Sequence, residues 1–407
     1  MDTATSHRPR HPIHRFPLAY LLIIPVLLSI LTALTLFMHS DTTLPILYSQ
    51  CHARSRLPLV THSPVLPSFL ATPLCFLVSF FQEAVASSRA AGVMAAVLSF
   101  VGGLLTVSTV EAARVCNGPS MLIAYPTGAW LVFNLAGGAI VWELVILPAF
   151  FHRSKAIVEA RRRGATGREL ASGGGGGGGG GGATDPNFGE AMRHLERAVE
   201  VVAIPVGVAL GYVVPSVVML ATKGQPLAVL VWLLFPVWVT VVRQLVRKGM
   251  LTALNKSRHD GEAGGEEPSW WAASFHLEES RVALAAMYAL PVLCSVVSHG
   301  LLVWSLVGRD DRKEMTRATE KFIVIDVFFI GLTVLYWLVV ESGWRVVAVV
   351  VAVSVVLGPG AGICVGWVYR ERMVDLDRSV TVVAVGSRRG SNGGEGAAAS
   401  EETPLLG

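Results

Sequence analysis

Residues 92–110 read GVMAAVLSFVGGLLTVSTV, a run of nineteen residues without a charged side chain. A helix that crosses the hydrocarbon core of a bilayer needs roughly 20 mainly apolar residues. Similar runs recur along the chain, at 16–38, 65–81, 122–151, 199–221, 226–242, 282–307, 322–340 and 344–367. The sequence therefore predicts an all-α, polytopic integral membrane helical bundle with eight or nine transmembrane helices.

The composition agrees with this interpretation. Of the 407 residues, 52% are hydrophobic and 15% are charged, and the mean hydropathy is +0.56. A soluble domain carries about 25% charged residues. A soluble enzyme, a coiled coil and a disordered chain are excluded, and most of the Arg and Lys behind the net charge of +4 can be assigned to membrane orientation.

Five segments follow from the runs and the loops between them. We expect a cytoplasmic basic N-terminus (1–15), N-terminal transmembrane helices (16–151), a basic Gly-rich cytoplasmic loop (152–198), C-terminal transmembrane helices (199–367) and a disordered tail (368–407). We expect the ten glycines Gly173–Gly182 to form a flexible linker. The protein should be a multi-pass membrane protein of the endoplasmic reticulum.

Basic loops define the orientation. The segments after Phe151 and after Val242 are rich in Arg and Lys, which places both on the cytoplasmic side, together with the N-terminus. Nine crossings would then leave the Arg-bearing tail on the opposite side, so at least one run should not cross fully. The run 65–81 is the weakest because prolines crowd its start, but the sequence does not identify the run that fails to cross.

Carboxylates inside apolar runs are costly and suggest functional sites. Glu143 is the first candidate catalytic acid, because it lies deep in the fourth run and no basic residue lies three or four positions away. It should be neutral unless another helix supplies a partner. Glu83, Glu111 and Asp326 are the alternatives, in that order. Glu111 can instead form an interfacial ion pair with Arg114, and Asp326 can simply cap or anchor its own helix beside Lys321.

Aromatic and polar side chains within the runs are the candidate substrate-binding residues, namely Tyr125, Trp130, Phe133, Asn134, Tyr212 and His299. A neutral acid beside aromatic faces suits carbocation chemistry, because the acid supplies the proton and the rings stabilise the cation. Simpler explanations stay open. Aromatic residues also form interfacial belts, Asn134 can bond to a neighbouring helix, and His299 can be a packing residue.

Metal and disulfide signals are weak. Asp310-Asp311-Arg312-Lys313-Glu314 formally matches an aspartate-rich DDxxE pattern, but basic residues surround it and no second magnesium motif follows. The five cysteines have no CxxC spacing, so we expect neither a structural metal nor a disulfide framework. No GxSxG, HExxH, Rossmann or P-loop pattern is present.

Several short stretches resemble the fungal membrane-bound terpene cyclase family, which includes ascofuranone-type cyclases and integral membrane relatives in indole-diterpene gene clusters. They are Phe80-Phe81-Gln82-Glu83, Glu111-Ala112-Ala113-Arg114, Ile123-Ala124-Tyr125-Pro126-Thr127 with Asn134, and Tyr212-Val213-Val214-Pro215. The resemblance spreads over most of residues 65–367 and excludes the glycine tract and the tail.

The resemblance implies a metal-independent terpene cyclase of meroterpenoid or indole-diterpene metabolism. Such an enzyme isomerises an (epoxy)prenyl chain after acid initiation and needs no cofactor. Its partners would be a lipophilic prenylated small molecule and membrane lipid, with no nucleic acid. The competing class is a membrane transporter or exporter of a cluster metabolite, and a membrane scaffold or receptor is a third.

Overall fold

The chain is described by a computed structural model over residues 12–39, 68–172, 194–260, 275, 277 and 280–371. The tract Gly173–Gly182 and the tail beyond 371 lie outside these ranges. Within them the fold is all-helical, as the sequence predicted, and the only departures toward strand are isolated bridges from Leu195 to Arg114 and to Phe275.

Five segments are long and apolar enough to cross a membrane. They are α2 (Leu18–His39), α6 (Ser88–Ala112), the continuous segment Glu200–Ala221, α16 (Arg281–Val307) and α17 (Glu314–Ser342). Glu200–Ala221 comprises α12 (Glu200–Val208), the π-helical turn η3 (Ala209–Val213) and α13 (Val214–Ala221). The pair α14 (Pro226–Leu233) and α15 (Phe235–Asp260), bent by 61°, would make a sixth span. Eight or nine crossings are therefore not confirmed, and three of the apolar runs account for the difference.

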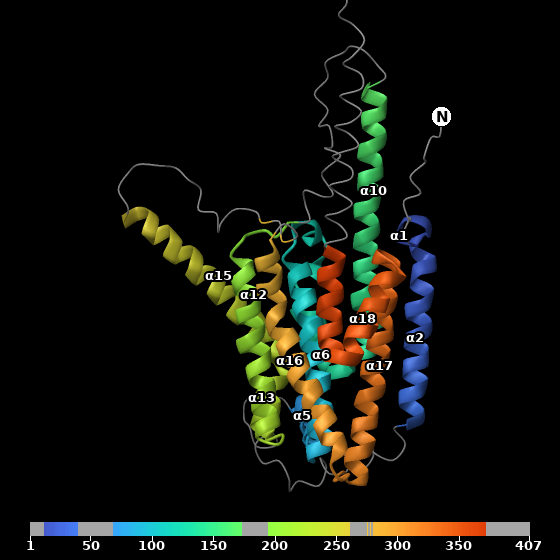
Figure 1. Ribbon diagram of the computed structural model, residues 1–407, viewed down its shortest axis with the longest axis vertical. Helices are drawn as coiled ribbons and strands as arrows, with labels where there is room; N and C mark the ends of the chain where they lie inside the picture. The colour runs from blue at the N-terminus through green and yellow to red at the C-terminus, as the bar shows by residue number, and fades with distance from the viewer. Residues whose placement is uncertain are drawn as a thin grey trace, which may run out of the picture.

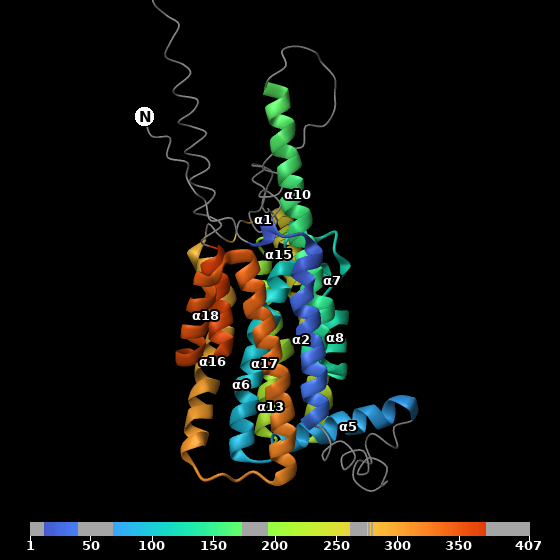
Figure 2. The ribbon, with the colours of Figure 1, turned by 90° about the vertical axis from the view of Figure 1, so that its right-hand side faces the viewer.

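The run 65–81 forms α5 (Ser68–Ala84), which lies across the lower end of the bundle rather than along it (Figure 2). It has 17 residues, fewer than the roughly 20 that a helix needs to cross a bilayer. This is the run that the prolines marked as weakest.

The run 122–151 doubles back inside the bundle and is called the first hairpin. After the short η1 (Val115–Asn117), α7 (Met121–Ala124) and α8 (Thr127–Ala136) descend from the upper end (Figure 2). Then α9 (Gly138–Val141), the π-helical turn η2 (Trp142–Ile146) and α10 (Leu147–Ser172) climb back. The turn lies at mid-depth, because Ala139 bonds to Asp326 near the middle of α17, whereas Ser154 bonds to Glu341 at its upper end.

The hairpin turns at Gly137, whose φ of +110° is open to glycine and strained for other residues. Pro126 immediately precedes α8 and so helps to define its start. A sequence that seemed long enough for one crossing is thus divided into two half-length limbs.

The last run also doubles back and is called the second hairpin. α18 (Trp344–Leu357) descends from the upper end, and helical residues 359–371 return to it (Figure 1). Its turn lies at mid-depth, where Ser295 Oγ donates to Leu357 O at 3.2 Å. Gly358, with φ +93°, makes the turn. Arg370 then pairs with Glu341 at 2.6 Å, back at the level where α18 began.

The transverse α5 and the two hairpins explain how both the N-terminal side and the Arg-bearing C-terminal side of the bundle can lie at the same end, which nine crossings did not allow. Six passages along the bundle, α15 included, return the chain to its starting end, so α1 (Pro12–Arg15), the protruding part of α10 and the end of α15 all lie at the upper end (Figure 1). Glu371 lies there too, since it pairs with Arg114 just after α6 at 2.9 Å. The basic segments after 151 and after 242 both begin at this end.

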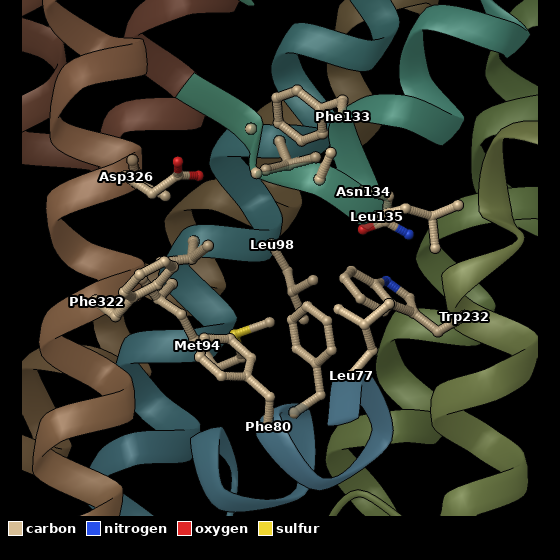
Figure 3. Close-up of a pocket in the computed structure, with 18 of the residues that line it drawn as sticks. Leu77, Phe80, Met94, Leu98, Phe133, Asn134, Leu135, Trp232, Phe322 and Asp326 are labelled. Atoms are coloured by element: carbon tan, nitrogen blue, oxygen red, sulfur yellow. The ribbon is translucent and has the colours of Figure 1, made fainter. Parts of the chain in front are cut away.

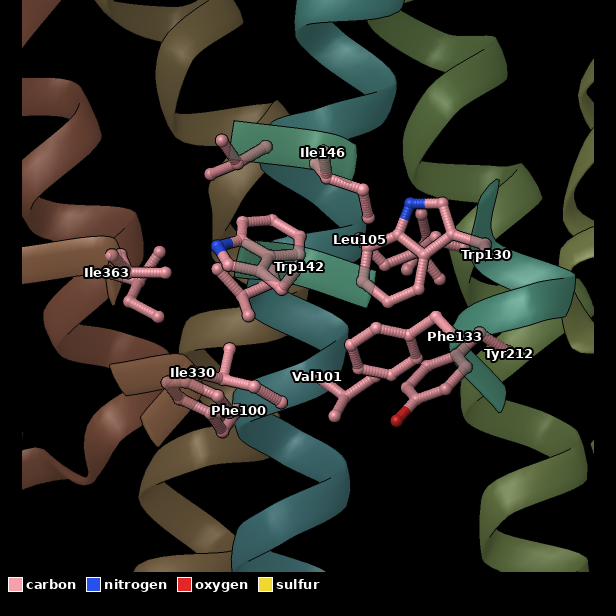
Figure 4. Close-up of a cluster of buried hydrophobic side chains, with 14 of the residues drawn as sticks. Phe100, Val101, Leu105, Trp130, Phe133, Trp142, Ile146, Tyr212, Ile330 and Ile363 are labelled. Carbon is pink, nitrogen blue, oxygen red and sulfur yellow. The ribbon is translucent and has the colours of Figure 1, made fainter. Parts of the chain in front are cut away.

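The core surrounds α6, of whose apolar window 83% is buried. Small residues on α6 let other backbones come close: a Cβ on Gly103 would lie 3.0 Å from the carbonyl oxygen of Gly360. Large aromatic side chains fill the space between α6 and the first hairpin (Figure 4). Trp130 and Trp142 lie there with ring centroids 5.9 Å apart. Such packing, rather than a hydrophobic driving force, stabilises helix association in lipid.

Candidate active site

A cavity of about 220 Å³ lies below the tip of the first hairpin (Figure 3). It is called the aromatic cavity, because seven aromatic side chains contribute to its wall: Phe76, Phe80, Phe81, Phe133, Trp232, Phe235 and Phe322. The rest of the wall is aliphatic, apart from Asn134 and Asp326.

Local sequence explains how the rings converge. Phe76 and Phe80 are four residues apart on α5 and so share one face. Trp232 and Phe235 flank the bend between α14 and α15, which turns both toward the cavity. The rings meet edge to face: centroids are 5.6 Å apart for Phe80 and Phe322, and 4.8 Å apart for Phe81 and Trp232. Such a wall can present electron-rich ring faces to a cation.

Asp326 supplies the one carboxyl group among the residues that line this cavity. Its Oδ1 accepts a hydrogen bond of 2.9 Å from the backbone N–H of Ala139, and the N–H of Gly138 also donates to it. Asp326 therefore sits at the N-terminal end of α9, where free amides stabilise negative charge. Asp326 thus caps α9, whereas the alternative drawn from the sequence was that it caps or anchors its own helix.

Asn134 lies on the cavity wall and donates from Nδ2 to the carbonyl oxygen of Leu233 at 2.8 Å. This carbonyl belongs to the bend between α14 and α15. The alternative that Asn134 bonds to a neighbouring helix is therefore confirmed, and the bond fixes α8 against the cavity wall.

Glu143, the first-ranked acid, does not line the aromatic cavity. Its side chain is 0% exposed and lies between α2 and α17. Thr32 Oγ1 lies 3.1 and 3.3 Å from its two carboxyl oxygens, and Thr333 Oγ1 lies 3.3 Å from Oε1.

The hydroxyl of Thr333 lies within hydrogen-bond distance of two acceptors. Thr333 Oγ1 lies 2.8 Å from the carbonyl oxygen of Phe329 and 3.3 Å from Glu143 Oε1, and a hydroxyl has a single hydrogen to share between them. Glu143 therefore lies between two threonine hydroxyls, those of Thr32 and Thr333.

The other two acids lie at opposite ends of the bundle. Glu83 is half-buried at the lower end, 3.4 Å from Thr316 Oγ1. Glu111 is buried at the upper end, where it pairs with Arg114 at 3.2 Å and with Arg370 at 3.1 Å. The ion-pair alternative for Glu111 is confirmed, and the pair also fastens the second hairpin to α6.

The remaining predicted binding residues separate. Phe133 lines the aromatic cavity. The ring of Trp130 packs against that of Phe133, and the two ring centroids are 4.7 Å apart. Tyr125 is 72% exposed near the upper end. Tyr212 is buried and donates to the carbonyl oxygen of Leu98 at 2.7 Å. His299 lies beside the turn of the second hairpin, near Gly358.

The sequence did not identify most of the cavity wall as a site. Phe76, Phe322 and the pair at the helix bend were unremarkable aromatic residues within apolar runs. Their convergence depends on α5 lying across the bundle and on the bend after Leu233, which composition does not reveal. The four-residue spacing of Phe76 and Phe80 was the one available signal.

The acidic pair Asp310 and Asp311 has a structural role at the lower end. Asp310 pairs with Arg312 at 2.9 Å, while Asp311 accepts the backbone N–H of Ser88 at 2.7 Å at the start of α6. Among the described residues, no group of three or more His, Cys, Asp and Glu side chains could hold a metal. Cys75 on α5 is disulfide-bonded, which the cysteine spacing did not predict.

The chain was compared with protein-family models, with curated proteins and with solved structures, and nothing matches in any of the three comparisons.

Proposed function

We propose that this protein is a multi-pass membrane enzyme that cyclises a prenyl or epoxyprenyl chain, with Asp326 as the acid. The observation that carries the proposal is a cavity walled by seven aromatic side chains around a single carboxyl group. The resemblance of Phe80-Phe81-Gln82-Glu83 and of the other short stretches to membrane-bound terpene cyclases points to the same chemistry.

The proposed reaction is an isomerisation. The protonated Asp326 carboxyl gives its proton to the epoxide oxygen, and a C–O bond breaks to leave a carbocation. Alkene electrons of the prenyl chain then attack the cation and form the ring C–C bond. The last cation loses a proton to the Asp326 carboxylate, directly or after capture by a substrate hydroxyl, and this restores the acid.

The surroundings of Asp326 suit both proton transfers. As the proton leaves, negative charge grows on oxygens that face the N–H groups of Gly138 and Ala139, so charge is stabilised where it develops. The rings stabilise the positive charge on the chain, and the apolar wall keeps water from the cation. Asp326 replaces Glu143 as the proposed acid because it alone of the four candidates lines the cavity.

The proposal includes insertion in the endoplasmic reticulum membrane with the upper end in the cytoplasm. The basic segments begin at the upper end. The disulfide at Cys75 belongs to the lower end, and disulfides persist in oxidising compartments such as the lumen. A lipophilic substrate would already be dissolved in this bilayer.

A second candidate function is export of a small lipophilic molecule. The observation in its favour is the pair of hairpins that turn at mid-depth, since transporters often build their sites from interrupted helices. An apolar molecule rather than an ion would be the cargo, because the cavity wall is mainly aromatic.

The test uses microsomes that contain the full chain, supplied with epoxyfarnesylated and epoxygeranylgeranylated aromatics, with products identified by mass spectrometry and NMR. The parent should form a ring product of unchanged mass. Asp326→Asn should lower turnover by at least ~100-fold, the usual effect of losing a positioned acid. Glu143→Gln, outside the cavity, is the matched control and should stay active.

Absence of any ring product in the parent would refute the cyclase. Uptake of the unchanged substrate into sealed vesicles would then favour export. If Asp326→Asn is active and Glu143→Gln is dead, the acid is misassigned but the reaction class survives.

A further inference from the structure

A second cavity, of about 450 Å³, opens near the upper end of the bundle and has no role in the proposed reaction. It is called the upper cavity, and its polar wall consists of Thr109, Arg114, Tyr125, Thr127, Glu196, Thr240, Arg243, Gln244 and Arg247. Hydroxyl, amide and charged groups therefore line it where the aromatic cavity has rings.

The charge of the upper cavity is balanced. Arg243 pairs with Glu200 at 2.8 Å, and Arg247 pairs with the same carboxylate at 3.4 Å and with Glu196 at 3.8 Å. Arg114, the third arginine of this wall, pairs with Glu111 at 3.2 Å and with Glu371 at 2.9 Å. All three guanidinium groups are thus occupied by carboxylates. A neutral group that forms hydrogen bonds fits this wall better than an anion does.

The two cavities adjoin along three helices. On α6 the lining passes from Val101 in the aromatic cavity to Leu105 in the upper cavity. On α8 it passes from Phe133 to Trp130. These steps of three or four residues correspond to about one helical turn, or 5.4 Å.

On α15 the lining changes between consecutive residues, since Phe235 belongs to the aromatic cavity and Pro236 to the upper one. The wall between the cavities is therefore one layer of side chains thick. Figure 4 shows the Trp130 ring at the level of Leu105 and the Phe133 ring below it, at the level of Val101.

Trp130 is the main part of this layer. Its side chain is 1% exposed, and its ring lies 4.7 Å from that of Phe133 and 6.0 Å from that of Phe235. One hydrogen bond fixes its orientation, from Nε1 to Ser108 Oγ at 3.0 Å. The helix that carries it has ten residues between Pro126 and Gly137.

We propose that the two cavities are parts of one binding site for an amphipathic molecule and that Trp130 is the partition between them. The apolar chain of the molecule occupies the aromatic cavity, and its neutral, hydroxyl-bearing head occupies the upper cavity once the Trp130 side chain has moved aside. The prenyl nature of the chain rests on the proposed function, whereas the passage itself does not.

Thiol labelling tests the passage without any turnover, so a failure of the cyclase proposal leaves this test interpretable. Reporter cysteines are introduced as Gln244→Cys in the upper cavity and Val101→Cys on the buried wall of the aromatic cavity, after Cys116, Cys294 and Cys364, which form no disulfide, have been changed to Ala. A membrane-impermeant maleimide is added to the cytoplasmic face of sealed microsomes.

Gln244→Cys should be labelled whatever residue stands at 130. Val101→Cys should be labelled roughly tenfold faster with Trp130→Ala than with Trp130, and this factor is equivalent to about 1.4 kcal/mol. Trp130→Phe, which keeps a ring, should preserve the slow rate. An unchanged rate in Trp130→Ala, with Gln244→Cys still labelled as a sign of intact folding, would overturn the passage.

The ligand class is tested with a farnesylated phenol, farnesol and phenol as probes. Near its dissociation constant the farnesylated phenol should slow labelling of both reporters by about twofold, since half the sites are then filled. Farnesol should protect Val101→Cys but not Gln244→Cys. Two results would overturn the shared site. In one, phenol protects Gln244→Cys as well as the farnesylated phenol does; in the other, none of the three probes protects Gln244→Cys.

Discussion

The carboxyl group of Asp326 on α17 accepts a hydrogen bond of 2.9 Å from the backbone N–H of Ala139, at the turn of the first hairpin. Two helical turns further along the same face of α17, Thr333 contacts Glu143 of that hairpin at 3.3 Å. One helix therefore holds the hairpin at two levels. The lower contact faces the aromatic cavity and the upper one is sealed from it, which gives the two carboxyl groups different roles.

The turn of the first hairpin should depend on glycine at position 137. Gly137→Ala places a Cβ on a residue with φ +110°, and we expect a loss of about 1–3 kcal/mol in the free energy of unfolding. Gly128→Ala is the control, because it lies within α8 and no atom lies within 4 Å of the new Cβ. It should be neutral or stabilising by up to about 1 kcal/mol. Thermal unfolding of the detergent-solubilised protein measures both, and equal effects would contradict the assigned turn.

Glu143 should tolerate a neutral amide but not an apolar side chain. Glu143→Gln keeps a donor and an acceptor between Thr32 and Thr333, so the unfolding temperature should hardly change. Glu143→Leu loses both contacts, at about 0.6 kcal/mol for each membrane-embedded hydrogen bond, and should unfold earlier. A Gln variant as unstable as the Leu variant would show that the ionised carboxylate is required.

Asp311 should make the lower end of the bundle sensitive to acid. The backbone N–H of Ser88, with a smaller contribution from that of Arg89, stabilises the carboxylate and lowers the pKa of Asp311. A lowered pKa in the folded state contributes stability above the unfolded value of about 3.9, and this stability is lost as the pH falls through the folded value.

Asp311→Asn should therefore lower the unfolding temperature at pH 7, and its difference from the parent should shrink as the pH falls below about 4. Glu314→Gln, which removes an exposed carboxylate at the start of α17, is the comparison and should have the smaller effect. A difference that stays constant with pH would show that the carboxylate charge is not involved.

The orientation can be read from a natural sequon. Asn255-Lys256-Ser257 lies near the upper end of α15, so it should stay unmodified if this end is cytoplasmic. Migration on a denaturing gel, with and without a glycosidase that removes N-linked glycans, reports this directly. A glycan that disappears in Asn255→Gln would place the upper end in the lumen and refute the proposed topology.

The sequence by itself determined that the chain is helical and contains helices long and apolar enough for a bilayer. The low charge content and the length of the apolar runs suffice for this prediction, because a helix that fits the hydrocarbon core of a bilayer must be apolar over nearly all of its length. It also identified the few ionisable residues inside the apolar runs, Glu143 and Asp326 among them, and the ion pair of Glu111 with Arg114, since three residues on a helix return to the same face.

Only the tertiary structure decided which runs form helices long enough to cross a membrane and which acid lines the cavity. Runs 122–151 and 344–367 are mainly apolar, so their periodicity does not show a turn, and Gly137-Gly138 and Gly358-Pro359-Gly360 are only local turn signals. A glycine within an apolar helix is common, and its backbone turns back only when packing makes it do so, as α6 does with Gly360. The same packing turns Asp326 toward the rings of Phe80 and Phe322 and encloses Glu143 between two threonines, a difference of environment that two carboxyl groups in apolar sequence do not reveal.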